Sequence, residues 1–125
     1  MAGSFAAIAR LTAAFHGRVW LVSKCGPRIQ ERSLRWLEGH DFSRRTGIPM
    51  PHVRFCRARA DKRKHCDELG LTHFVDDRPE VHTAIRDSVD HQYLFGPQSG
   101  PALPFTRAVR DWAETEQLIL ATLTP

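Results

Sequence analysis

This chain of 125 residues lacks the segments that mark membrane proteins and disulfide-rich proteins. It has no run of about 18 apolar residues, the length that a membrane-spanning helix needs. Its cysteines, Cys25, Cys56 and Cys66, are odd in number and show no C-x-x-C spacing. This pattern argues against a disulfide framework and predicts a reducing, cytoplasmic location with no membrane partner.

Acidic residues are scarce in the first half of the chain. Met1 to Val22 contain no Asp or Glu, and residues 1–64 carry 14 Lys and Arg against 4 acids, whereas residues 65–125 carry 4 against 10. The basic residues between positions 54 and 64 could meet a polyanion or nucleic acid: Arg54, Arg57, Arg59, Lys62, Arg63 and Lys64. Such a run is more often a solvated helix face, and no nucleic-acid-reading motif accompanies it. We therefore do not expect nucleic acid as a partner.

Short apolar runs alternate with helical spacings along the chain, which predicts an α/β fold with a mostly parallel sheet in three layers, α/β/α. The expected strands are Val19–Val22, Val53–Cys56, His73–Val75 and Tyr93–Phe95. Helices are expected at about Ser4–His16, Arg28–His40, Arg59–Leu69 and from Pro79, with a loop from Asp41 to Pro51. At this length the chain is expected to form a single domain, residues 1–125.

The last quarter of the chain is expected to finish the domain with a helix. Residues 1–98 form the predicted core, residues 99–104 a linker, and residues 105–123 a helix with Val109, Trp112, Ile119 and Leu123 turned inward. The three tryptophans, Trp20, Trp36 and Trp112, are most simply interpreted as core or packing aromatics.

Two adjacent carboxylates, Asp76 and Asp77, follow the apolar run His73-Phe74-Val75 and precede a helix that begins near Pro79. In open α/β sheets ligands bind at this carboxyl edge of the strands. Adjacent acids repel one another, and a hard cation such as Mg²⁺ relieves the repulsion. The alternative is structural, because Asp77-Arg78-Pro79-Glu80 also has the spacing of a capping box.

Two further polar residues stand at comparable boundaries. Ser23 follows the apolar run Val19–Val22, and Lys62 opens the helical segment that ends before Gly70. A hydroxyl can donate to a phosphoryl oxygen, a lysine supplies a compact positive charge, and two acids can hold Mg²⁺. Together these residues predict a site that handles phosphate.

In order and spacing, these residues resemble the haloacid dehalogenase-like (HAD) superfamily, which consists mostly of phosphatases and phosphotransferases. Ser23 is similar to the second family motif, Lys62 to the third, and Asp76-Asp77 to the acidic fourth, over roughly Ala6 to Gln98. The resemblance implies catalytic roles for Ser23, Lys62 and Asp77, metal ligation by Asp76 and Asp77, Mg²⁺ as cofactor and a phosphorylated substrate.

The first family motif, an Asp-x-Asp that carries the nucleophile, has no counterpart before Ser23. Its strand would lie at the centre of the sheet, and without it backbone groups of both neighbouring strands would have no partner. We expect a fragment or a misassigned start, and Ser4 to His16 resembles the helix that follows the absent strand. The alternatives are direct pairing of the strands near Val19 and Phe74, or a strand supplied by another chain, including a second copy.

The resemblance therefore implies a capless HAD-like domain related to Mg²⁺-dependent phosphomonoester hydrolases that act through an aspartyl-phosphate. As given, the chain has no nucleophile, so we expect it to be inactive alone. The competing hypothesis is a non-catalytic module on the same fold that binds phosphate, nucleic acid or protein.

Overall fold

A computed structural model describes residues 4–123, which divide into two compact units at Arg57 and Ala58. Each unit contains a small sheet in which every strand pair is parallel. The predicted α/β class with parallel strands is thus confirmed, while the expectation that residues 1–125 act as one domain stays a prediction.

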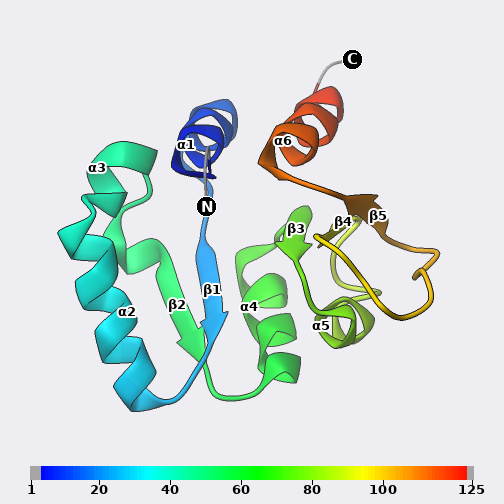
Figure 1. Cartoon of the computed structure of the whole chain (residues 1–125), viewed down its shortest axis with the longest axis horizontal. Coiled ribbons are helices and arrows are strands. Elements are labelled where there is room, and N and C mark those ends of the chain that lie inside the picture. Colours follow the sequence, from blue (N-terminus) through cyan, green and yellow to red (C-terminus); the bar gives the residue numbers. More distant parts are fainter. Residues whose placement is uncertain (1–3, 124–125) are drawn as a thin grey trace. The chain divides into compact units, whose positions relative to one another are not determined.

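The N-terminal unit contains a two-stranded parallel sheet (Figure 1). In the sequence, one helix precedes the first strand, and the other helices of the unit lie between the two strands. Residue pairing between its strands runs from Leu21 opposite Val53 to Lys24 opposite Cys56. Its elements are α1 (Ser4–Ala14), β1 (Leu21–Lys24), α2 (Pro27–Gly39), α3 (Phe42–Thr46), the short 3₁₀ helix η1 (Met50–His52) and β2 (Val53–Cys56).

A hydrophobic core in this unit joins α2, α3 and β2. Its buried members are Leu37, Phe42, Ile48 and Val53. The ring of Phe5, on α1, meets Phe42 edge to face at 5.5 Å. This core explains why the segment 41–51, predicted as a loop, contains α3: Phe42 and Thr46 are buried there, and a helical turn satisfies the backbone groups that this burial removes from water. The segment also contains the start of η1.

The C-terminal unit contains a three-stranded parallel sheet in the order β3-β4-β5 (Figure 1). Its core is formed by Cys66, Phe74, Val81, Ile85 and Val89, so the predicted inward spacing from Val81 to Val89 is confirmed. The elements are the 3₁₀ helix η2 (Arg59–Asp61), α4 (Lys62–Leu69), β3 (His73–Asp76), α5 (Pro79–Ala84), β4 (His91–Phe95), β5 (Arg107–Val109) and α6 (Trp112–Ala121).

The predicted helix over residues 105–123 is wrong in its first part. Arg107–Val109 forms β5, which pairs with β4 in parallel, and α6 begins only at Trp112. Val109 is buried as predicted, but from a strand, and Leu123 is 43% exposed rather than inward. A three-residue strand is too short for its periodicity to differ visibly from the start of a helix.

Other expectations about side chains and strands differ from the structure in part. Trp36 packs against Phe5 and His40, as expected of a packing aromatic, but it is not a core residue because 53% of it is exposed. β1 was expected to end before Ser23, whereas it spans Leu21–Lys24 and includes Ser23. β1 and β3 belong to different sheets, which does not match the alternative in which these two strands pair directly.

Candidate functional site

Lys62 and Asp76 form a close ion pair in the C-terminal unit. Lys62 is the first residue of α4 and Asp76 is the last residue of β3. The Lys62 Nζ donates to Asp76 Oδ2 at 2.7 Å, and the two side chains are only 10% and 7% exposed. The other carboxylate oxygen, Asp76 Oδ1, accepts from the backbone N–H of Arg78 at 2.9 Å. The structure therefore joins two residues that the sequence assigned to one site, although 14 positions separate them.

Asp77 lies next to this pair in the chain and has an exposed side chain. Its backbone carbonyl accepts from Gln98 Nε2 at 3.0 Å. The capping-box interpretation of Asp77 is wrong: the N-cap of α5 is Arg78, with no side-chain capping bond, and Glu80 lies 3.6 Å from Arg59. The carboxylate of Asp77 is thus available to solvent and to ligands.

A buried polar network lies behind Asp76. His82 is completely buried and its Nε2 is 3.0 Å from the backbone carbonyl of Asp76. Its Nδ1 is 3.0 Å from Gln92 Oε1. Gln92 Nε2 donates to the carbonyls of Ile85 and Val89, which fixes the orientation of the amide. This network ties the carboxyl end of β3 to α5 and β4, and sequence reasoning missed it because neither residue belongs to a recognisable motif.

Ser23 belongs to the N-terminal unit. It is half-buried in β1 and lies opposite Phe55 of β2, and its backbone carbonyl is 3.7 Å from the thiol of Cys56. The expectation that its hydroxyl joins Lys62 and Asp76 stays a prediction.

The cysteines of the described region are all free thiols. Burial, together with the neighbouring Asp67, raises the pKa of Cys66 to about 11. A thiol with such a pKa carries almost no thiolate at neutral pH, so Cys66 is suited to packing rather than nucleophilic attack.

His73, at the start of β3, is held as a neutral imidazole. Thr122 donates its hydroxyl proton to the carbonyl of Ile119, so its oxygen accepts from His73 Nε2 at 2.8 Å. The His73 Nδ1 then accepts from Thr72 at 2.7 Å. Burial, and after it the adjacent ring of His91 at 4.4 Å, lowers the pKa of His73 to about 4. These bonds give His73 a structural role at the start of β3.

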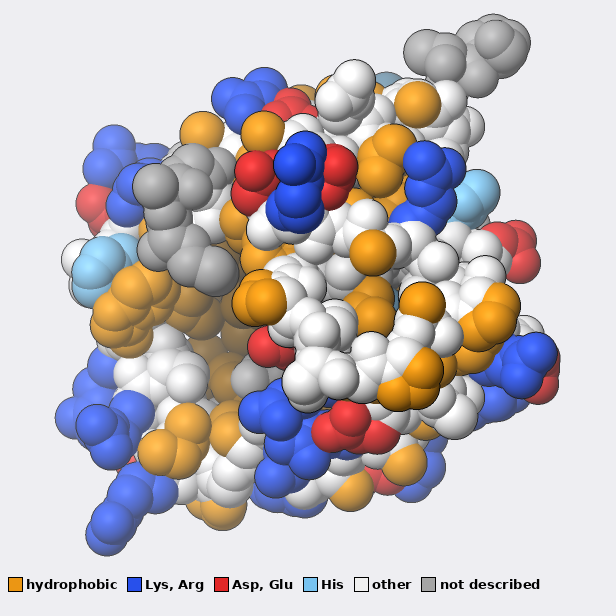
Figure 2. Space-filling model, turned by 45° about the vertical axis from the view of Figure 1, so that its right-hand side comes forward, with side chains coloured by type: hydrophobic (Ala, Val, Ile, Leu, Met, Phe, Trp, Pro, Cys, Tyr) orange, Lys and Arg blue, Asp and Glu red, His pale blue; other side chains and the backbone are white. Residues whose placement is uncertain are grey.

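The basic residues from Arg54 to Lys64 are largely occupied by partners inside the described units. Arg57 donates to the carbonyl of Cys25 at 2.8 Å, and Arg63 lies 3.5 Å from Asp67. Lys64 lies 3.4 Å from Asp61. On the face shown in Figure 2, Lys and Arg side chains are interspersed with hydrophobic and acidic ones. These basic side chains therefore have local partners in ion pairs and hydrogen bonds.

Among residues 4–123, no group of three His, Cys, Asp or Glu side chains is placed to hold a metal ion. Mg²⁺ is commonly held by one or two carboxylates together with water and substrate phosphate oxygens. Metal ligation by Asp76 and Asp77 therefore stays a prediction.

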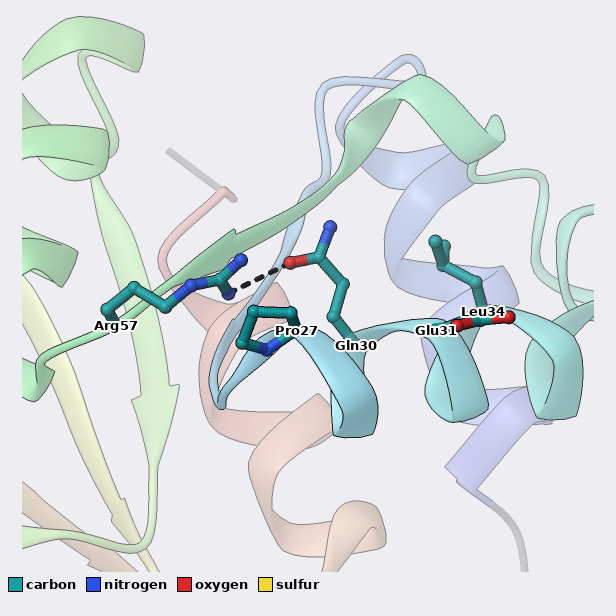
Figure 3. A pocket seen from close by; sticks show the side chains of 5 residues that line it. All are labelled: Pro27, Gln30, Glu31, Leu34 and Arg57. Carbon is teal, nitrogen blue, oxygen red and sulfur yellow. Dashed lines mark hydrogen bonds between the residues drawn. The ribbon is translucent and has the colours of Figure 1, made fainter.

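A shallow hollow of about 190 Å³ lies beside the N-terminal half of α2 (Figure 3). Its lining consists of Pro27, Gln30, Glu31, Leu34 and Arg57. The guanidinium of Arg57 reaches across it to Gln30 Oε1 at 2.9 Å. Ligand pockets usually measure about 300–1,000 Å³, so this hollow offers little room for a substrate.

Comparison with known proteins assigns neither a family nor a function to this chain. A scan against protein-family models, a search of curated proteins and a search of solved structures each find no match. None of the helices in the described part of the chain combines the length and the apolar character that crossing a membrane requires.

Proposed function

We propose that this chain is a HAD-like domain related to Mg²⁺-dependent phosphomonoester hydrolases, with a three-layer α/β/α fold. In this proposal Lys62, Asp76 and Asp77 form the phosphate-binding site. The chain by itself binds a phosphoryl group and does not hydrolyse it, because no Asp-x-Asp nucleophile motif precedes Ser23.

The observation that carries the proposal is the bond of 2.7 Å between Lys62 Nζ and Asp76 Oδ2. The family resemblance requires a lysine at a helix start and an acid at a strand end to serve one site, and these are the positions of the two residues. A buried ion pair can also be purely structural. The exposed carboxylate of Asp77 beside the pair favours a site, since a structural pair needs no second acid.

Each side chain has a defined task in this proposal. The ammonium of Lys62 attracts phosphate oxygens, and Asp76 orients that ammonium. Asp77 and Asp76 would hold Mg²⁺ together with the phosphate, and the cation would neutralise charge on the phosphoryl group. The buried His82–Gln92 network fixes the backbone on which Asp76 is carried.

The test is hydrolysis of p-nitrophenyl phosphate with Mg²⁺ by two proteins. The chain as given should release p-nitrophenol no faster than buffer, because loss of a nucleophile typically costs several orders of magnitude in rate. A version extended at its N-terminus by a Val- and Ile-rich strand that ends in Asp-x-Asp should gain activity. Replacing the first Asp of the added motif by Asn is the matched control and should abolish the gain.

Two results would contradict the proposal. Turnover by the unextended chain that Asp76→Asn abolishes would mean that another residue is the nucleophile. If the extended protein folds but shows neither turnover nor phosphate binding, the non-catalytic module that binds protein becomes the better hypothesis.

A further inference from the structure

The outward face of α2 exposes large apolar side chains in the N-terminal unit. Ile29 is 47% exposed and Trp36 is 53% exposed. They are seven residues apart, which places them on one side of the helix about 10 Å from each other. Single exposed apolar residues are common on protein surfaces, but two aligned on one helix, one of them Trp, form a surface suited to packing.

Arginines border this apolar pair. Arg28, Arg32 and Arg35 are exposed and follow one another at spacings of four and three, so they line the neighbouring strip of the helix. Arg35 lies 3.6 Å from Glu31. Arg28 and Arg32 make no ion pair with any other described residue. We call these five residues the α2 face: Arg28, Ile29, Arg32, Arg35 and Trp36.

The surroundings of Trp36 hold its ring in place. The ring stacks on His40 at 4.0 Å between centroids and meets the edge of Phe5 at 6.1 Å. His40 is fixed in turn, because its Nδ1 bonds the carbonyl of Trp36 at 2.8 Å. An aromatic side chain that is positioned before binding loses little entropy when a partner covers it. Trp and Arg are also the residue types most often found to dominate binding energy.

We propose that the α2 face binds an amphipathic helix of a partner protein whose apolar stripe is flanked by Asp and Glu. Ile29 and Trp36 would pack against the apolar stripe, and Arg28 and Arg32 would pair with the acidic flank. Complementary charge sets the choice of partner in such helix pairs. This inference concerns the N-terminal unit and does not rest on the proposed phosphate site.

Charge argues against two other occupants of this surface, a second copy of the chain and nucleic acid. If α2 packed antiparallel on its own copy about a two-fold axis, the arginine strip of one helix would face that of the other, and like charges repel. For nucleic acid, the acids Glu31 and Glu38 border the arginine strip on its other side and would repel phosphates. One face of the Trp36 ring is already covered by His40, which leaves less surface for base stacking.

The experiment uses the full chain labelled with ¹⁵N and two synthetic helical peptides with the same leucine stripe, one flanked by Glu and one by Lys. The Glu peptide should bind saturably, with amide shifts concentrated on α2, at an affinity of about micromolar to tens of micromolar because the face is small. Trp36→Ala and Ile29→Ser should each weaken binding, the first by about tenfold or more. The double variant Arg28→Glu/Arg32→Glu should no longer bind the Glu peptide and should bind the Lys peptide instead.

Arg18→Glu is the matched control, since Arg18 is exposed in the same unit but lies off α2. Its affinity for the Glu peptide should stay within about twofold of the parent chain. Circular dichroism of each variant separates lost binding from lost folding. Equal binding of both peptides, or none of the Glu peptide by a folded chain, would overturn the inference. If the chain forms a dimer and Trp36→Ala dissociates it, the occupant is a second copy and the inference is overturned. Binding of oligothymidine that requires Trp36 would overturn it in favour of nucleic acid.

Discussion

Lys62 and Asp76 are nearly removed from water, and each side chain lies beside the opposite charge of the other. Taking a carboxylate or an ammonium out of water is costly unless an opposite charge compensates it. Their pairing at 2.7 Å provides that compensation, and the N–H of Arg78 satisfies the second oxygen of Asp76. The pair therefore contributes to folding whether or not a ligand is present.

Breaking this pair from one side should be more harmful than removing both charges. We expect Lys62→Met and Asp76→Leu each to lower the free energy of unfolding by about 3–5 kcal/mol, because each leaves a buried charge without a partner. The double variant should recover a large part of the loss. Urea unfolding of the four proteins gives the coupling energy. Additive losses would mean that the two charges do not interact in solution.

His73 predicts a dependence of stability on pH. Its pKa is lowered to about 4 in the folded chain, first by burial and then by His91, from the ordinary value of 6.5. The unfolded chain therefore binds a proton at a higher pH than the folded chain, and stability falls as the pH drops from about 6.5 to about 4. Protonation also removes the acceptor that Thr72 uses.

Replacing His73 by Gln isolates this contribution from that of the carboxylates. We expect the melting temperature of the parent chain to fall more steeply between pH 6.5 and 4 than that of His73→Gln. The exposed His16 lies in the other unit, so His16→Gln is the control and should keep the slope of the parent chain. Parallel curves for the parent chain and His73→Gln would show that His73 titrates normally.

At the scale of elements, the helix caps show where local sequence signals succeed and fail. The D-x-x-E spacing occurs twice. At Asp77-Arg78-Pro79-Glu80 no capping box forms, whereas at Asp111 the side chain accepts from Glu114 N at 2.9 Å, and Glu114 Oε1 accepts from Arg110 N at 2.7 Å. The second signal was overlooked because residues 105–123 were interpreted as one continuous helix.

These two acids allow a direct comparison of cap strength. Asp111→Ala should lower the free energy of unfolding by about 0.5–2 kcal/mol, the usual loss for an N-cap. Asp77→Ala should change it by less than about 0.5 kcal/mol, as expected for an exposed residue without such a role. Thermal unfolding of both variants measures the difference. An equal loss in both would restore the capping interpretation of Asp77.

Most of the strands could be predicted because buried parallel strands appear as continuous apolar runs. Val53–Cys56 has the predicted bounds, and His73–Val75 lacks only Asp76. β5 was missed because its three residues contain Arg and Ala, which also suit helices. The exposure of Ile29 and Trp36 could not be predicted either, since helical spacing shows which residues share a face but not what covers that face.

At the scale of the whole molecule, the two units differ in charge as well as in sheet size. Residues 1–57 carry ten Lys and Arg against three acids, and residues 58–125 carry eight against eleven. The sequence predicted the α/β class and the closeness of Lys62 to Asp76, because residues at strand ends and helix starts share one edge of a parallel sheet. The buried partners His82 and Gln92 arise from tertiary packing and leave no pattern in the sequence.

The central claim is that Lys62, Asp76 and Asp77 serve one phosphate site. Paramagnetic relaxation by Mn²⁺, added as a substitute for Mg²⁺ with inorganic phosphate, tests it most directly in the ¹⁵N-labelled chain. Broadening by Mn²⁺ depends steeply on distance, so the proposal predicts that the amides of Lys62, Asp76 and Asp77 broaden together, and that Asp77→Asn reduces the effect. Broadening confined to other exposed acids, or broadening at Asp76 and Asp77 that leaves Lys62 sharp, would contradict the claim.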